Sequence, residues 1–213
     1  MNKINSWRWG FFMMGLIVIA LGVSLTIKGQ TFGVGSWDVL HIGLFKNFGF
    51  SIGSWSIITG LIIIGVTAIG TRQFPKIGTF INMVSIGIFI DFFNWLLPDV
   101  DHLALQFFSF LIGIILIGLG GGMYISANLG AGPRDSLMLL AVDKLGLSIT
   151  KARTIMEIAV AVAGWLLGGP VGLGTVLMAF GLGPIVQFSL AYSRKLLLKC
   201  IGEEQVTFSE LTK

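Results

Sequence analysis

The chain has 213 residues, of which 54% are hydrophobic and 11% are charged, and its formal net charge is +4 at pH 7. A soluble domain of this length needs more charge at its surface, so the composition excludes a soluble fold and indicates an integral membrane protein. The basic residues stand at the ends of apolar runs, where they orient membrane helices, so the positive charge does not indicate a nucleic-acid partner. The single cysteine, Cys200, excludes an internal disulfide framework.

The apolar segments, taken in chain order, predict six spanning helices, because each approaches the roughly 20 residues that a span needs. Two further stretches hold only about 12 residues each, or roughly 18 Å of helix, and cannot cross a core about 30 Å thick. We therefore expect an all-α polytopic protein with six spanning helices and two short helices that are re-entrant or interfacial. The predicted spans are 9–27, 54–71, 77–97, 103–127, 153–168 and 172–193, and the short stretches are 36–47 and 133–145.

The charges between these segments favour six spans over eight. With six spans, nearly every basic cluster falls on one side and the acidic turn at Asp99 and Asp101 falls on the other, as the positive-inside rule requires. Lys28 and Lys46 are the exceptions. The expected location is the cytoplasmic membrane, with both termini in the cytoplasm.

The sequence also repeats itself. Residues 21–49 and 119–146 align, and both contain a glycine-rich break. Since each half holds three spans, the halves should have opposite orientations, as a 3+3 inverted repeat. We expect repeats at 1–100 and 101–200, intertwined in one membrane domain, and a cytoplasmic tail at 201–213. The matched positions are Gly33-x-Gly35-Ser36-Trp37-Asp38 with Gly130-x-Gly132-Pro133-Arg134-Asp135, Gly15 and Gly22 with Gly113 and Gly120, and Gly78-Thr79 with Gly174-Thr175.

The breaks hold the main candidate site. Asp38 and Asp135 recur at the same place in both halves. One interpretation is that they only cap two helices, because an acidic side chain favours a helix N-terminus. The other is that they lie at membrane depth and bind a proton, a cation or an amine, since carboxylates inside a membrane usually mark a pathway. In that case the broken backbone at Gly33, Gly35, Gly130 and Gly132 would supply carbonyls and amides.

Further polar residues have both a structural and a functional interpretation. Arg134 fits the cytoplasmic side by orientation alone, or contacts an anionic group of a substrate; the matching Trp37 is expected to be an interfacial anchor. Asp91 reaches the headgroups or belongs to the site. Asn128 lines a cavity or satisfies unwound backbone.

Three other expectations are structural. We expect an i,i+4 pair between Arg153 and Glu157, and no metal site at His41 and His102. We also expect the first and fifth helices to pack closely through their glycines, which are Gly15, Gly22, Gly113, Gly118, Gly120, Gly121 and Gly122.

The two breaks, GxGSWD and GxGPRD, together with the hydropathy and size of the chain, resemble the YczE/YyaS/YitT group of bacterial integral membrane proteins over about residues 8–195. The resemblance implies the bacterial inner membrane and suggests transport. It provides no catalytic residues.

The function expected from these features is a small secondary transporter or exporter of a small organic solute, with a midplane site between the repeats and one half rocking against the other. Its partners would be the lipid bilayer, a small-molecule or ion substrate and a second copy in a homodimer. We expect no enzymatic activity and no cofactor, since no nucleotide-binding fingerprint is present. Two alternatives stay open: a substrate-binding membrane subunit of an energised transporter, and a membrane scaffold or assembly factor that does not transport.

Overall fold

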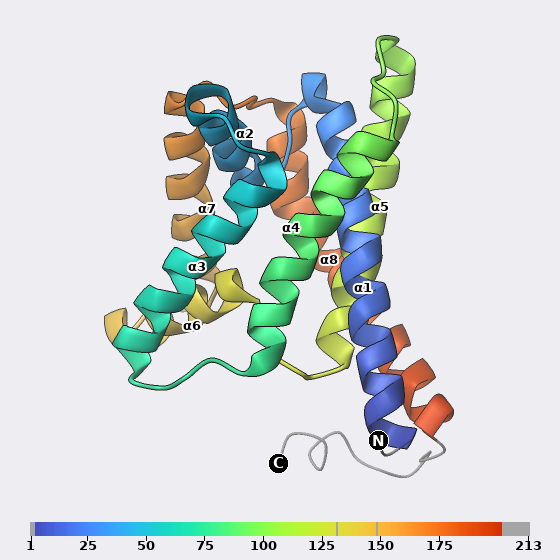
Figure 1. Ribbon diagram of the computed structural model, residues 1–213, viewed down its shortest axis with the longest axis vertical. Helices are drawn as coiled ribbons and strands as arrows, with labels where there is room; N and C mark the ends of the chain where they lie inside the picture. The colour runs from blue at the N-terminus through green and yellow to red at the C-terminus, as the bar shows by residue number, and fades with distance from the viewer. Residues whose placement is uncertain (1–2, 131, 148, 202–213) are drawn as a thin grey trace.

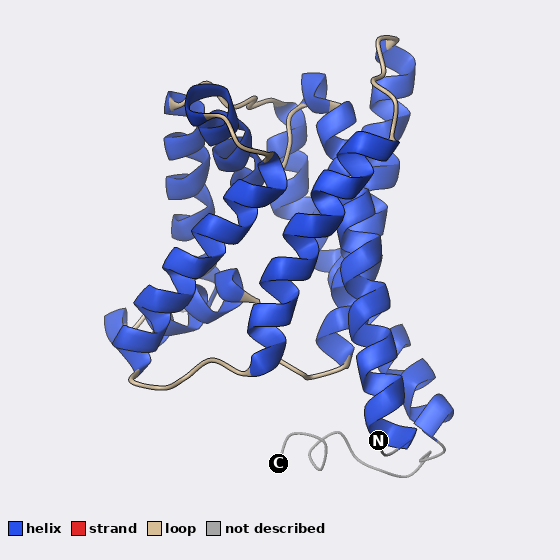
Figure 2. Ribbon diagram, in the orientation of Figure 1, coloured by secondary structure: helices blue, strands red, loops and turns tan. Residues whose placement is uncertain are grey.

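The computed structural model describes residues 3–130, 132–147 and 149–201, and the regular structure in them is helical, as predicted (Figure 2). The predicted tail lies outside the described residues, except for Ile201, which ends the last helix. The helices are α1 (Lys3–Lys28), a 3-10 turn η1 (Gln30–Phe32), α2 (Ser36–Phe48), α3 (Ile52–Thr71), α4 (Ile77–Leu96), α5 (Leu103–Ser126), α6 (Pro133–Leu145), α7 (Ile149–Leu166) and α8 (Leu173–Ile201).

Five of these helices, α1, α3, α4, α5 and α8, are long and apolar enough to cross a membrane. The sixth predicted span, α7, forms as a helix of 18 residues but is not among these five. It carries Lys151, Arg153 and Glu157 within that length. Many large apolar side chains are exposed, among them Leu173 and Phe180 on α8. An apolar outer surface of this extent is suited to lipid, not to water.

The helices form two bundles, which lie side by side in Figure 1. In one, which we call the core bundle, α1 packs on α4, α5 and α8, and α5 packs on α8. In the other, the side bundle, α2 packs on α3 and α7, and α6 packs on α3 and α7. Among the described residues, close packing between the bundles is concentrated where α3 meets α4, and the pair α7 and α8 has no comparable contact.

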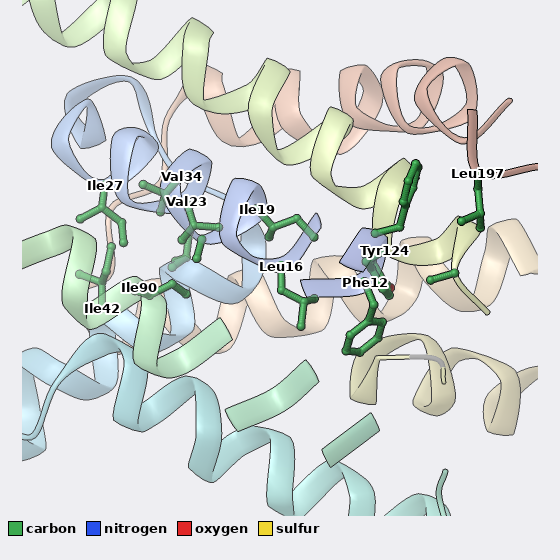
Figure 3. Packing of buried hydrophobic residues seen from close by; sticks show 14 of the residues in the cluster. Phe12, Leu16, Ile19, Val23, Ile27, Val34, Ile42, Ile90, Tyr124 and Leu197 are labelled. Atoms are coloured by element: carbon green, nitrogen blue, oxygen red, sulfur yellow. The ribbon is translucent and has the colours of Figure 1, made fainter. Parts of the chain in front are cut away.

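Helix α1 is the centre of the core bundle. In its most apolar segment 56% of the residues are buried, compared with 22% in α8. The buried side chains of α1, including Phe12, Leu16, Ile19 and Val23, make up much of the main hydrophobic cluster (Figure 3).

Helices α1 and α5 run in opposite directions and touch through glycines. A Cβ at Gly15 would lie 2.8 Å from the Gly120 carbonyl oxygen, and one at Gly22 would lie 2.7 Å from the Gly113 carbonyl oxygen. Backbones approach this closely only where side chains are absent, as small residues allow in membrane helices. The other predicted contact glycines of α5 do not face α1. Cβ atoms at Gly118, Gly121 and Gly122 would instead meet side chains or backbone of α8, so α5 has a second glycine face.

The two short helices lie at opposite ends of the molecule (Figure 1). Each has 13 residues and begins directly after a glycine, Gly35 before α2 and Gly132 before α6. Pro133 opens α6, where a missing N–H leaves no hydrogen bond unmade. Asp38 and Asp135 lie in the first turns, where a negative charge favours the helix dipole.

The two lysines that depart from the charge pattern are both held at the end of the molecule opposite the start of α1. Lys28 Nζ lies 2.5 Å from Asp99 Oδ1, and Lys46 Nζ donates to the Gly168 carbonyl at 2.9 Å. The hydrogen bond and charge of Lys28 lower the pKa of the exposed Asp99 carboxyl below its ordinary value. Local partners therefore account for the two exceptions.

Candidate functional site

A cavity of about 430 Å³ lies between the core bundle and the side bundle. The N-terminal turns of both short helices reach it, so the two glycine-rich breaks meet at one place although they come from opposite ends of the molecule. Its wall is mostly apolar and includes aliphatic and methionine side chains from α1, α3, α4, α5 and α8. Its ionisable lining residues are Asp38, Tyr124, Arg134, Asp135, Arg153 and Glu157.

The backbone before each short helix is fixed by the opposite half of the chain. Gly33 has φ +104°, and a Cβ there would lie 2.6 Å from Thr175 Oγ1 at the start of α8. Gly130 has φ +155°, and a Cβ there would lie 2.9 Å from the Thr79 nitrogen at the start of α4. Neither glycine lines the cavity, so their described role is to hold the breaks in place. Gly35 and Gly132 do line it.

Asp38 is almost fully buried, at 3% exposure. Its Oδ1 lies 3.9 Å from His41 Nδ1, and neither atom has a hydrogen-bond partner among the described residues. The other ring nitrogen of His41 lies 2.9 Å from Thr59 Oγ1. A buried carboxylate without its full set of partners is costly and usually marks a ligand or ion site.

Asp135 has a different environment from its counterpart. Its Oδ2 accepts a hydrogen bond of 2.8 Å from the Tyr124 hydroxyl. Asn82 also lines this part of the cavity. The repeated aspartates therefore share a position at a helix start but not a set of partners.

Trp37 and Arg134, the residues that differ between the two breaks, touch each other. The Arg134 guanidinium carbon lies 4.9 Å from the centroid of the Trp37 ring, within the range of a cation–π interaction. Trp37 is 5% exposed, so the prediction that it anchors the protein at the lipid interface is wrong. The burial of Trp37 could not be predicted from the sequence, because a tryptophan can start a short apolar helix of either the interfacial or the re-entrant kind.

The predicted ion pair between Arg153 and Glu157 is also wrong, since the structure shows none between these two described residues. Both line the cavity, and the counterpart helix α3 lines it with Ser56 and Gly60. The i,i+4 spacing places two side chains on one face of a helix but does not by itself bring their charged atoms within the distance of an ion pair.

Like Gly33 and Gly130, the predicted site residues Asp91 and Asn128 do not line the cavity. Asp91 accepts hydrogen bonds from the Ser51 hydroxyl and, at 2.8 Å, from the Gly53 backbone nitrogen, so it joins α4 to the start of α3. Asn128 has φ +52° just after α5, and its carbonyl accepts from Arg8 Nη2 at 3.0 Å. These contacts are structural.

Tyr124, Asn82 and Gln187 line the cavity without having been predicted as site residues. Tyr124 had a usable signal, because a hydroxyl inside an apolar helix needs a partner. The part of the chain that the structure describes has no group of three or more His, Cys, Asp or Glu side chains placed to hold a metal ion.

The apolar spans and the lipid-facing surface define an integral membrane protein that crosses the bilayer several times. The chain belongs to a family of unknown function, DUF6198, which matches residues 6–191.

Its relatives are consistent with this class. The chain is 50% identical over 190 residues to the uncharacterized membrane protein YczE of Bacillus subtilis, covering 89% of this chain and 88% of that one. An uncharacterized protein of Haemophilus influenzae is 36% identical over 182 residues, or 84% and 81% of the two chains. The uncharacterized protein YyaS of B. subtilis is 31% identical over 173 residues, or 80% and 86%. No solved structure matches the chain.

Proposed function

We propose that this protein is a small secondary transporter of a small organic solute in the cytoplasmic membrane. The observation that carries the proposal is the cavity of about 430 Å³ at which the starts of both short helices meet between two bundles. Its size lies within the range of small-molecule sites, and its wall is mostly apolar with a few convergent polar groups. Broken helices that meet near the midplane are the usual site architecture of secondary transporters.

In the proposed topology α7 is the sixth span, and α2 and α6 enter the membrane from opposite sides without crossing it. The distribution of the basic residues supports a cytoplasmic location for both termini. The contacts support an inverted repeat because they occur in matched pairs. Gly15 meets Gly120 as Gly113 meets Gly22, and the packing of the Gly33 break on α8 has its counterpart in the Gly130 break on α4.

The packing favours a different moving unit from the one expected from the sequence. Each bundle contains two helices from the first half of the sequence and two from the second half. A half cannot rock as a body, because α1 and α5, which belong to different halves, are in close backbone contact. The proposed motion is therefore that of one bundle against the other, with the cavity between them.

In this mechanism Asp38 and Asp135 are the ion or amine ligands. The backbone near Gly35 and Gly132 adds polar groups at the cavity, and Gly33 and Gly130 hold the breaks. Arg134 balances the two carboxylates. We propose no enzymatic role.

The test is charge movement in proteoliposomes, recorded on a solid-supported membrane after rapid addition of amines, amino acids or carboxylates. We expect one solute class to give a current, and the double variant Asp38→Asn and Asp135→Asn to abolish it while eluting normally in size-exclusion chromatography. An unchanged current in that variant would contradict the assigned ligands. Absence of current with every class would contradict transport of such solutes.

A further inference from the structure

We propose that the cavity binds an organic ammonium ion on the face of Trp37 beside Asp38, and that the Arg134 guanidinium occupies this place until the ligand displaces it. The inference rests on the same cavity as the proposed function and names its substrate class. It requires only binding, so it can be tested separately from transport.

The first observation is the position of Arg134. Its guanidinium carbon lies 4.9 Å from the Trp37 ring centroid, which shows that this face of the ring accepts a cation inside the cavity. Desolvated cation–π contacts of this kind are stronger than exposed ones and are used to recognise ammonium ligands. The Arg134 side chain therefore already makes the cation–π contact that we propose for the ligand.

The second observation is a pair of buried polar atoms that lack partners. Asp38 Oδ1 and Trp37 Nε1 have no hydrogen-bond partner among the described residues, and their side chains belong to residues only 3% and 5% exposed. Both residues line the cavity. A ligand with an ammonium group would donate to Asp38, and a hydroxyl or carbonyl near that group would accept from the indole nitrogen.

The third observation is that no polar partner among the described residues fixes the Arg134 guanidinium. It makes no ion pair or hydrogen bond within the described part of the chain, and it is partly exposed. Its long side chain starts in the first turn of α6, whereas Trp37 lies on α2. A rotation of the Arg134 side chain would uncover the ring without moving either helix.

The rest of the wall defines the body of the ligand. Met83, Met138, Met156 and Met178 line the cavity together with several isoleucines. Methionine side chains adapt to irregular apolar shapes. The ligand is thus an amphipathic amine, with its charge between the two short helices and its apolar part against α4, α7 and α8.

Three probes with the same apolar body separate charge from hydrophobicity: 4-phenylbutylamine, 4-phenylbutan-1-ol and 4-phenylbutyrate. Their binding to the full chain in nanodiscs would be measured by isothermal titration calorimetry, with empty nanodiscs subtracted to remove partition into lipid. We expect the amine to bind at least tenfold more tightly than the alcohol or the carboxylate. Equal binding of the three, tighter binding of the carboxylate, or binding of none would overturn the inference.

Variants test the two named residues in opposite directions. Asp38→Asn should weaken amine binding about tenfold or more, and Arg134→Gln should strengthen it several-fold, because a competing cation is removed. Lys76→Gln removes the same charge at the exposed start of α4, outside the cavity, and is the matched control. Weaker binding in Arg134→Gln, with Lys76→Gln unchanged, would overturn the displacement. Charge-selective binding without any transport current would leave the inference standing and contradict the proposed transport of such solutes.

Discussion

At the residue scale, the two aspartates show how one motif gives two environments. Asp38 is buried beside His41 and has an oxygen without a partner, whereas Asp135 accepts a hydrogen bond from Tyr124. The sequence could predict that these carboxylates lie at helix starts, because glycine and proline mark the breaks. It could not predict that Asp135 binds Tyr124 of α5, or that His41, which lies beside Asp38 on α2, contacts Thr59 of α3, because these contacts depend on the packing of the whole molecule.

The hydrogen bond of Tyr124 gives the first prediction. Tyr124→Phe removes the donor to Asp135 and leaves that carboxylate with fewer partners in the cavity. We expect a loss of about 1 kcal/mol in the free energy of unfolding, as for other side-chain hydrogen bonds in membrane proteins. Thermal unfolding in detergent, followed by size-exclusion chromatography, would measure it.

The second tyrosine is the control for this change. Tyr192 is 64% exposed on α8, so Tyr192→Phe should leave the midpoint temperature nearly unchanged. Equal midpoints for the two variants would show that the bond to Asp135 contributes nothing to stability.

At the scale of the elements, the contact of α1 with α5 depends on the absence of side chains. A methyl group at Gly22 would lie 2.7 Å from the Gly113 carbonyl oxygen and 2.8 Å from the Ile117 nitrogen, and neither backbone atom can yield alone. Gly22→Ala should therefore separate the helices and destabilise the protein by about 1–3 kcal/mol, the usual range for overpacking. Unfolding in detergent would show a lower midpoint temperature.

The same helix supplies a glycine that should respond in the opposite sense. Nothing lies within 4 Å of a Cβ at Gly10. Gly10→Ala should stabilise α1 by up to about 1 kcal/mol, because alanine is the better helix former. A loss of stability in Gly10→Ala as large as in Gly22→Ala would show that the α1–α5 contact is not the cause.

Most helix boundaries could be predicted from the sequence, but the packing partners of each helix could not. Hydropathy and the glycine breaks predict the short helices nearly to the residue. The same glycine pattern suggested that Gly118 and Gly121 face α1, whereas they face α8. A helix five turns or longer with glycine on two faces can pack against two partners, and its own periodicity does not say which partner takes which face.

At the scale of the whole molecule, the core bundle and the side bundle pack together through one pair of helices but not through the corresponding pair. Helix α3 packs on α4, and Asp91 ties α4 to the start of α3 through Ser51 and Gly53. The corresponding pair, α7 and α8, lacks comparable packing among the described residues. Under the proposed function, the two arrangements would exchange during transport, and the structure would then correspond to one of two access states.

This asymmetry leads to the last prediction. Asp91→Ala removes the hydrogen bonds that tie α4 to the start of α3, and we expect it to favour the state in which the cavity opens between these helices. The reporter is Ser56→Cys, which lines the cavity on α3, in a chain whose Cys200 is replaced by serine. With a membrane-impermeant thiol reagent added from the side opposite the termini, labelling should be slow in the parent and several-fold faster with Asp91→Ala.

Cysteines at two exposed loop positions define the sides of the membrane in this experiment. Gln73→Cys should react only from the side of the termini, and Val171→Cys only from the opposite side. If both react from the same side, the inverted topology fails. If they react from opposite sides but Asp91→Ala leaves the labelling of Ser56→Cys unchanged, the topology stands and the α3–α4 contact is not a gate. The two results separate the architecture from its motion, because the first depends on which helices cross and the second on how the bundles part.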